Sequence, residues 1–330
     1  MTREEVRQVG RLFKKICVLL VLLIILDRLI GTCLETAYKN APQGDIKTFT
    51  HSITNPVENI FIYGSSRAVH GYDTRIFTDS LELSCFNCGR ENSNILYHTV
   101  ILKEMLKKHS PEIIVLDVSA RELTWRSAEN SKLVLASMIL PYVRRDTSFA
   151  NIAKNLFPEE LIKTRVSKIY AYNSLILPLL AGKKEMLGIK SINGYEPIDG
   201  NKVADVQPYF TDESKGTDSV AQRSFEEFIK TVKEKKIMLY VIQSPLYVKP
   251  FRSSVSLNAI KNILKKYNEP FWDYGFDTAL TKKEYFYDNL HLNAGGAALF
   301  TQKLVSDIKA DLKKNKPSLL NSSLIKTNNE

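Results

Sequence analysis

Cysteine and histidine are scarce in this chain, which has four cysteines and five histidines among its 330 residues. Cys17 and Cys33 fall in an apolar segment, and the lone C-x-x-C of Cys85 and Cys88 has no second pair to complete a four-thiolate zinc site. The phosphate-binding pattern G-x-x-x-x-G-K-[S/T] is absent, and no carboxylate cluster indicates a metal. We therefore expect no metal and no cofactor. We favour buried structural cysteines at 85 and 88, with a short disulfide as the alternative outside the cytoplasm.

Acidic residues are fewer than basic ones. Lys and Arg number 46 against 36 Asp and Glu, which gives a formal net charge of +10 and a pI of about 9.2. A basic protein can bind nucleic acid, anionic lipid or acidic glycan. Because the lysines are spread along the expected helices and are not grouped with aromatic residues, we expect no nucleic acid partner. The charge suits a protein that works beside an anionic membrane.

Only one long apolar run occurs, and it lies near the amino terminus. Residues 16–26 are apolar without interruption, and the apolar character resumes after Asp27 and Arg28 up to residue 34. The pattern predicts a transmembrane signal anchor over 16–34. A cleaved signal peptide and a buried helix of a soluble protein are the alternatives. The excess of positive charge in the basic tail, residues 1–15, predicts a cytoplasmic amino terminus and an extracytoplasmic remainder.

The remainder of the chain alternates between β-type and helical patterns. Helical periodicity separates five short β-type runs, of which the third is nearly all apolar, as is typical of a strand buried on both faces. This alternation predicts an α/β fold, a three-layer α/β/α sandwich around a mainly parallel five-stranded sheet. The five runs are 59–63, 84–87, 112–118, 236–243 and 271–274.

The expected organisation has one main domain, residues 56–314, joined to the anchor by a polar linker, residues 35–55. The stretch 127–218 breaks the β/α rhythm, with helical patterns followed by Gly and Pro punctuation. We interpret it as a helical insertion that caps the carboxyl edge of the sheet. The tail, residues 315–330, is polar and expected to be disordered.

The first chemical motif is Tyr63-Gly64-Ser65-Ser66-Arg67, which follows the first strand directly. Ligands of parallel sheets bind outside the carboxyl ends of the strands. A serine at such a turn lies at the positive end of a helix, near free backbone N–H groups that can stabilise an oxyanion. Ser66 is thus a candidate nucleophile. An ordinary helix N-cap is the alternative.

The second motif, residues 287–293, precedes the last expected helix and contains Asp288 and His291. A serine nucleophile needs an imidazole to take its proton, and the imidazole needs an acceptor that fixes its tautomer. A capped helix start, with Asn293 as the cap, is the alternative. His70, four residues after Ser66, is the backup base. The other histidines are expected in the linker (His51) and on helix surfaces (His98 and His109).

Together, G-x-S near the start of the sheet and D-x-x-H-L-N before the last helix resemble the SGNH (GDSL-like) hydrolase superfamily. They also resemble its membrane-anchored branch around bacterial cell-surface polysaccharide and O-acylation systems. The resemblance covers roughly residues 57–312 apart from the insertion. It implies a flavodoxin-like sheet, with Ser66 as nucleophile, His291 as general base and Asp288 as the residue that orients the base.

The chain departs from the family pattern in three places. Ser65 replaces the Asp that often precedes the nucleophile. The second block contains Gly89, interpreted as a turn residue, and has Asn92 where the family has an oxyanion-binding Gly; Asn tolerates the left-handed geometry. The candidate oxyanion or substrate-binding residues are Ser66, Gly89, Asn92 and Arg121. In the third block Arg121 replaces the oxyanion-binding Asn. Arg121 could hold an anionic substrate or the oxyanion, or form a structural salt bridge with Glu122 or Asp117.

These features predict a serine esterase or O-acyltransferase that acts on O-acyl groups, acetyl above all, of cell-surface glycans through an acyl-enzyme on Ser66. The alternative is a non-catalytic protein of the same fold, which binds glycan or serves as a scaffold in an envelope assembly. The expected partners are the glycan and the membrane. Whether water or a sugar hydroxyl accepts the acyl group stays open.

Overall fold

The structure is a computed structural model that describes residues 2–179, 191–203, 205–209, 216–251 and 254–320. The chain divides into two compact units. The helical unit comprises Met1–Pro42 and Leu135–Leu187, and the α/β unit comprises Gln43–Val134 and Gly188–Glu330. We describe each unit by itself.

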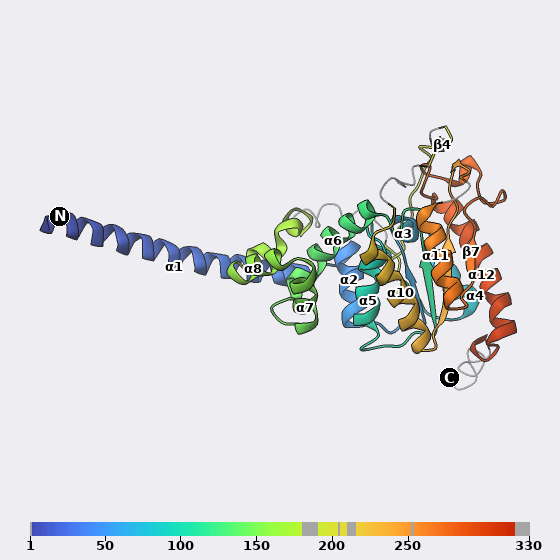
Figure 1. Cartoon of the computed structure of the whole chain (residues 1–330), viewed down its shortest axis with the longest axis horizontal. Coiled ribbons are helices and arrows are strands. Elements are labelled where there is room, and N and C mark those ends of the chain that lie inside the picture. The colour runs from blue at the N-terminus through green and yellow to red at the C-terminus, as the bar shows by residue number, and fades with distance from the viewer. Residues whose placement is uncertain (1, 180–190, 204, 210–215, 252–253, 321–330) are drawn as a thin grey trace. The chain divides into compact units, whose positions relative to one another are not determined.

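A five-stranded parallel sheet forms the centre of the α/β unit (Figure 1). Each predicted strand is present within a residue or two of its expected bounds, and the order β2-β1-β3-β5-β7 is flavodoxin-like. The central strands are fully buried because apolar residues line both faces. The strands are β1 (Ile60–Tyr63), β2 (Cys85–Asn87), β3 (Ile113–Asp117), β5 (Met238–Gln243) and β7 (Phe271–Asp273).

Helices cover both faces of this sheet (Figure 1), which confirms the predicted three-layer α/β/α fold. On one face α12 packs against α3 and α4, and on the other α10 packs against α5 and α11. The first face comprises α3 (Ser66–Gly71), α4 (Thr74–Leu81) and α12 (Ala294–Asn315), and the second α5 (Ile95–Met105), α10 (Ser219–Glu234) and α11 (Val255–Lys266). A small pair of strands, β4 (Gln207–Pro208) and β6 (Val248–Lys249), lies outside the main sheet, as does η4 (Lys283–Tyr285).

The predicted polar linker, residues 35–55, is helical instead. α1 continues to Lys39, and α2 (Gly44–Thr54) packs against α5. The reason is a helical spacing of apolar residues, since Ile46, Phe49 and Ile53 share one buried face.

The predicted insertion, residues 127–218, also has different bounds. Leu135–Leu187 clusters with the amino-terminal helix, whereas residues from Gly188 onward belong to the α/β unit. α6 (Trp125–Ile139) crosses this boundary. The expected cap over the sheet stays a prediction. The other elements of the helical unit are η1 (Leu140–Tyr142), α7 (Thr147–Leu156), α8 (Pro158–Val166) and η2 (Ile169–Leu175).

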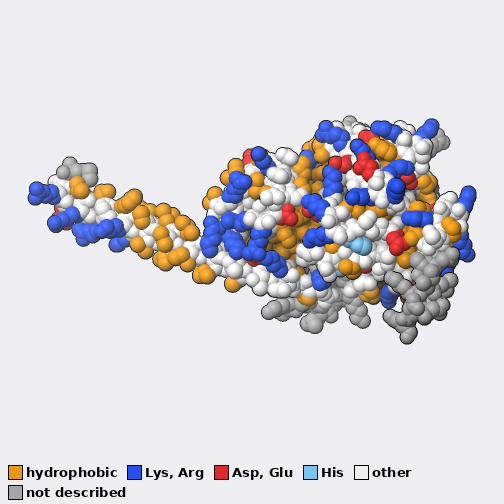
Figure 2. All heavy atoms as spheres, turned by 90° about the horizontal axis from the view of Figure 1, so that it is seen from below, with side chains coloured by type: hydrophobic (Ala, Val, Ile, Leu, Met, Phe, Trp, Pro, Cys, Tyr) orange, Lys and Arg blue, Asp and Glu red, His pale blue; other side chains and the backbone are white. Residues whose placement is uncertain are grey.

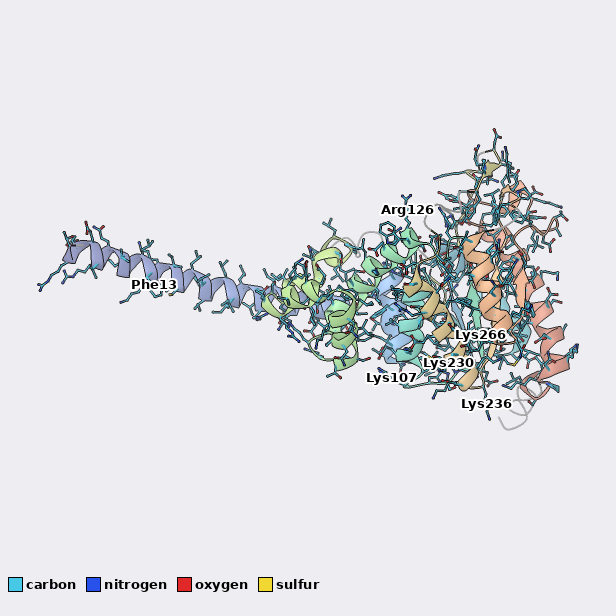
Figure 3. All side chains as sticks on the ribbon, viewed as in Figure 1. Phe13, Lys107, Arg126, Lys230, Lys236 and Lys266 are labelled. Atoms are coloured by element: carbon cyan, nitrogen blue, oxygen red, sulfur yellow. The ribbon has the colours of Figure 1, made fainter. Side chains whose placement is uncertain are left out.

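α1 (Arg3–Lys39) is long and apolar enough to cross a membrane. An 18-residue window of this helix has a mean hydropathy of 2.5, and only 6% of that window is buried. Its hydrophobic side chains form a continuous exposed stretch beyond the basic first turns (Figure 2), and Phe13 projects freely from the helix (Figure 3). α1 is therefore a candidate membrane anchor or signal sequence. On the α/β unit the basic residues are scattered, with Lys230 on α10 and Lys266 on α11 (Figure 3).

The carboxyl-terminal tail begins later than predicted. α12 extends to Asn315, and Leu319 is 9% exposed because it packs on the hydrophobic core. The predicted disorder of residues 321–330 lies outside the described residues.

Candidate functional site

The turn between β1 and α3 presents Ser66 at the carboxyl edge of the sheet. Gly64 has a φ of 151°, and a Cβ there would lie 2.9 Å from the Cβ of Asp117 on β3, so only glycine fits. The N-cap of α3 is Ser65, and Ser66 is the first residue of the helix. The alternative that Ser66 is the N-cap is therefore wrong.

Ser66, His291 and Asp288 lie in a hydrogen-bonded line. Ser66 Oγ is 2.7 Å from His291 Nε2, and His291 Nδ1 is 2.9 Å from both carboxylate oxygens of Asp288. The carboxylate accepts the Nδ1 hydrogen, which leaves Nε2 free to accept the serine hydroxyl hydrogen. The structure thus brings together the three residues expected to be catalytic. Their catalytic role stays a prediction.

The loop that carries Asp288 and His291 is held by its own backbone. Asp288 Oδ1 accepts hydrogen bonds of 2.8 Å from the amides of Leu290 and His291. Burial opposes ionisation of Asp288, but the bonds from the His291 ring and from the two amides outweigh it and lower the pKa of Asp288 to about 2. Asn293 caps α12 by accepting from the Gly296 amide at 2.9 Å. The capped helix start and the histidine–carboxylate pair are therefore one structure, not alternatives.

Two of the expected substrate-binding positions follow β2. Gly89 is a turn residue whose amide donates to Asn87 Oδ1 at 2.9 Å, so it is not free to bind substrate, and this expectation is corrected. A Cβ on Gly89 would lie 2.8 Å from the Val69 nitrogen. Asn92 has a φ of 55°, the left-handed geometry expected of it, and within the described residues its amide donates no hydrogen bond. Its role as an oxyanion donor stays a prediction.

Arg121 forms no ion pair with Glu122 or Asp117, and so the salt-bridge alternative is wrong. Its guanidinium lies 4.9 Å from the ring centroid of Tyr209, and Nε donates to the Tyr209 hydroxyl at 3.2 Å. The side chain is exposed. Arg121 therefore remains available to an anionic group. Tyr209 in turn stacks on Phe251, with ring centroids 5.5 Å apart.

Asp117 is paired instead with Arg67, the residue after the candidate nucleophile. Arg67 Nη2 donates to Asp117 Oδ2 at 3.0 Å and to the Val118 carbonyl at 2.6 Å, and Arg67 is only 6% exposed. Asp117 Oδ1 also accepts from the Tyr72 hydroxyl at 2.9 Å and from the Ser244 amide at 3.0 Å. This network joins α3 to the ends of β3 and β5, and so it fixes the backbone on which Ser66 stands. The sequence contains no signal for a pair separated by 50 residues.

His70 lies beside His291, with ring centroids 5.9 Å apart, but its ring nitrogens bind other groups and not the Ser66 hydroxyl. Nδ1 is 2.7 Å from the Glu196 carbonyl oxygen, and Nε2 is 3.1 Å from a carboxylate oxygen of Glu91. Both partners are acceptors, so both ring nitrogens carry hydrogen when Glu91 is ionised. Burial opposes this charge, but the bonds to Glu91 and Glu196 outweigh it and raise the pKa of His70. The charged form of His70 is thus favoured, and because both ring nitrogens are bound to other groups, His70 is not placed to act as the base for Ser66.

Residues 192–203 also adjoin the site. The sequence analysis did not predict this position. Asn193 and Gly194 both have positive φ and form a tight turn against β2, where the Asn87 amide donates to the Asn193 carbonyl at 2.8 Å. Farther along, the Ala294 amide donates to the Ile198 carbonyl, and the Lys202 amide to that of Tyr287. The segment therefore links β2 to the loop of His291. The Asn-Gly dipeptide was the available signal.

His98, Cys85 and Cys88 are buried structural residues. His98, expected on a helix surface, is fully buried, and burial lowers its pKa to about 3. Cys85 and Cys88 are buried free thiols, and burial raises the pKa of both well above the usual range. Within the described part of the chain, no group of His, Cys, Asp and Glu is arranged to hold a metal ion.

No family model matches this chain. No curated protein matches it either. Similar solved structures include an α/β hydrolase enzyme from the metagenome of Lake Arreo, Spain, with 9% identity, a TM-score of 0.40, and coverage of 76% of this chain and 94% of the other. A family two carbohydrate esterase from Clostridium thermocellum, in complex with cellohexaose, has 9% identity, a TM-score of 0.38, and coverage of 78% and 66%.

Proposed function

We propose that this protein is an SGNH-type serine esterase or O-acyltransferase, with Ser66 as nucleophile, His291 as general base and Asp288 as its orienting carboxylate. The observation that carries the proposal is the contact of 2.7 Å between Ser66 Oγ and His291 Nε2, with the Asp288 carboxylate on the opposite ring nitrogen. Nucleophile, base and orienter are the three roles that serine acyl transfer requires.

The chemistry follows from this line of groups. Ser66 Oγ attacks the acyl carbonyl carbon while His291 Nε2 takes the hydroxyl proton, and Asp288 stabilises the resulting imidazolium. The tetrahedral intermediate collapses, and His291 returns the proton to the departing alcohol oxygen, which leaves an acyl ester on Ser66. Water or a second hydroxyl then gives its proton to His291 and attacks this ester. The bond between the acyl carbon and Ser66 Oγ breaks, and His291 returns the proton to Ser66 Oγ. The Asn92 amide is the proposed oxyanion donor.

For the substrate we propose O-acylated, chiefly acetylated, glycans at the cell surface. The exposed Arg121 and the Tyr209–Phe251 ring stack, close to the end of β3, support a polar and anionic substrate. The apolar helix α1, preceded by basic residues, supports a single-pass membrane protein with a cytoplasmic amino terminus and an extracytoplasmic α/β unit.

The test is covalent labelling of the full chain in detergent with a fluorophosphonate probe. We expect labelling of the wild type, none of Ser66→Ala, and strong loss in His291→Gln. Ser244→Ala is a matched control, because Ser244 also follows a strand of the sheet and its hydroxyl has no hydrogen-bond partner among the described residues. The variant keeps the backbone amide that donates to Asp117, and it should label normally.

A folded wild-type protein that fails to label and does not hydrolyse 4-nitrophenyl acetate would overturn the proposal. That outcome would favour the second candidate function, a glycan-binding or scaffold protein of the same fold. Hydrolysis and transfer are separated by adding an acceptor sugar and measuring whether the acyl group reaches it.

A further inference from the structure

The exposed apolar stretch of α1 is short for a bilayer. From Ile16 to Ile30, interrupted only by Asp27 and Arg28, it has 15 residues, about 22 Å of helix at 1.5 Å per residue. The hydrocarbon core is about 30 Å thick. A span of this length is accommodated when the bilayer thins or when flanking polar residues enter the headgroup region. With α1 as the membrane anchor, either adjustment would bring lipid headgroups to Asp27 and Arg28.

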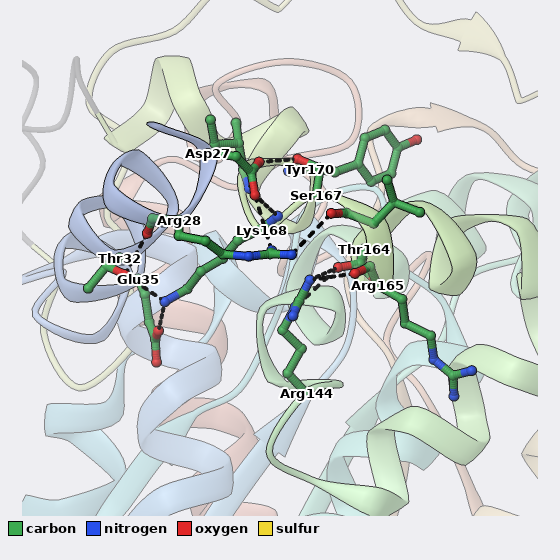
Figure 4. A network of polar contacts seen from close by, with 12 residues as sticks. Asp27, Arg28, Thr32, Glu35, Arg144, Thr164, Arg165, Ser167, Lys168 and Tyr170 are labelled. Atoms are coloured by element: carbon green, nitrogen blue, oxygen red, sulfur yellow. Dashed lines mark hydrogen bonds and ion pairs between the residues drawn. The ribbon is translucent and has the colours of Figure 1, made fainter. Parts of the chain in front are cut away.

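Asp27 and Arg28 both form hydrogen bonds with the segment around residue 167 (Figure 4). Asp27 accepts from the Ser167 hydroxyl, from the Lys168 amide at 2.8 Å and from the Ile169 amide at 3.2 Å. Arg28 donates to the Val166 carbonyl at 3.3 Å. The segment that follows α8 therefore lies at the same height on α1 as these two charges.

One turn later α1 becomes buried in the helical unit. Gly31 is buried, and a Cβ there would lie 2.6 Å from the Lys168 side chain. Glu35 forms ion pairs with Lys168 at 2.9 Å and with Arg145 at 2.7 Å. The helical unit thus begins where the lipid-facing part of α1 ends, and the end of α8 lies at its bilayer-side edge.

At that edge α8 exposes a mixture of apolar and basic residues. Ile162 is 60% exposed and Val166 is 73% exposed, one helical turn apart, and Lys163 and Arg165 beside them are exposed as well. Between residues 135 and 179 six Lys and Arg face three Asp and Glu. Exposed apolar side chains flanked by basic ones are typical of helices that lie in the surface of an anionic membrane.

We propose that α8 docks on the outer surface of the bilayer, with Ile162 and Val166 at the boundary of the acyl chains and Lys163 and Arg165 at the phosphates of anionic lipids. The docking rests on the membrane anchoring by α1 that is part of the proposed function. It continues the lipid-facing surface of α1 directly, which favours lipid over a second copy of the chain as the occupant of this face.

The test uses the full chain in nanodiscs of phosphatidylcholine and phosphatidylglycerol, with an environment-sensitive fluorophore on single introduced cysteines. Cys17 and Cys33 are replaced by Ser. The labelled positions are Ile162→Cys and Val166→Cys, with Leu22→Cys in the middle of α1 as a test of the anchor and Val57→Cys, 63% exposed on the α/β unit, as the matched control. We expect quenching by headgroup spin-labelled lipid at 162 and 166, by acyl-chain-labelled lipid at 22, and none at 57.

The outcomes separate the two proposals. Quenching at 22 with emission at 162 and 166 as unquenched as at 57 would overturn the docking and leave the anchor intact. An unquenched label at 22 would overturn the anchor itself. Blue-shifted emission at 162 and 166 without lipid quenching would overturn the docking in favour of a protein partner. As a second readout, replacing phosphatidylglycerol with phosphatidylcholine should reduce quenching at 162 and 166 but not at 22.

Discussion

Two histidine–carboxylate pairs lie side by side in this site, and they differ in the second partner of each ring. His291 has Asp288 on one nitrogen and the Ser66 hydroxyl on the other, and a hydroxyl can give or accept a hydrogen. His70 has Glu91 on one nitrogen and the Glu196 carbonyl on the other, and both are acceptors. The first arrangement lets the ring take a hydrogen from the hydroxyl. The second favours the charged ring, and so residue type alone does not show which histidine faces the serine.

The two histidine–carboxylate pairs should differ most when each carboxylate is changed to an amide. Asp288→Asn should reduce kcat by a factor on the order of 10³–10⁴, because an amide can hold the His291 ring in the wrong tautomer. Glu91→Gln should reduce kcat by less than about tenfold, since a glutamine keeps an acceptor oxygen for His70. The measurement is the initial rate of 4-nitrophenyl acetate hydrolysis. Equal losses in the two variants would show that His70 takes part in the chemistry.

The two arginines near the end of β3 provide the next test, one buried and one exposed. Arg67→Met should destabilise the α/β unit by about 3–5 kcal/mol, because it leaves Asp117 as an unpaired buried charge. Arg121→Met should change stability by less than about 1 kcal/mol, the size of an exposed cation–π contact. Melting temperatures of the full chain in one detergent compare the two. Similar melting temperatures for the two variants would contradict the network assigned to Arg67.

The smallest expected effect is the pH dependence of stability that His70 contributes. Since the folded pKa of His70 is raised, its contribution is fully present below its unfolded pKa and is lost as pH rises through the folded pKa. His70→Gln should therefore lower the melting temperature more at pH 5.5 than at pH 8.5. Because Glu91 is exposed, the corresponding difference in the free energy of unfolding should be on the order of 1 kcal/mol.

The other titratable groups around His70 are Asp45, Glu196 and His291, and they remain in both proteins, so the comparison with wild type isolates His70. A gap that widens toward pH 8.5 would mean that His70 is neutral in the folded protein.

The part of the site that the sequence predicted well is local. Asp288 and His291 are three residues apart in one loop, and Ser66 follows a strand after a glycine that no other residue can replace. Their signals lie within a few residues because backbone hydrogen bonds and steric limits act over that distance. The chain order of strands then brings the two motifs to one edge of the sheet.

The parts that were wrong depend on contacts between distant segments. Packing between distant segments decides that Arg67, and not Arg121, pairs with Asp117, 50 residues away. It also decides that His70 meets the carboxylate of Glu91, 21 residues away. The linker prediction failed for a different reason. A polar composition concealed the helical spacing of Ile46, Phe49 and Ile53 on α2.

Local sequence patterns predicted the strands, the α/β class, the apolar helix near the amino terminus and the loop that holds His291 with Asp288. Periodicity, the glycine after β1 and short-range hydrogen bonding suffice for these. The tertiary structure was needed to show that the His70 ring faces two acceptors, that Arg67 supports the backbone of Ser66, and that α8 lies where α1 leaves its apolar stretch. Those outcomes depend on which donors and acceptors meet when distant segments pack. Local sequence patterns do not predict such long-range pairs.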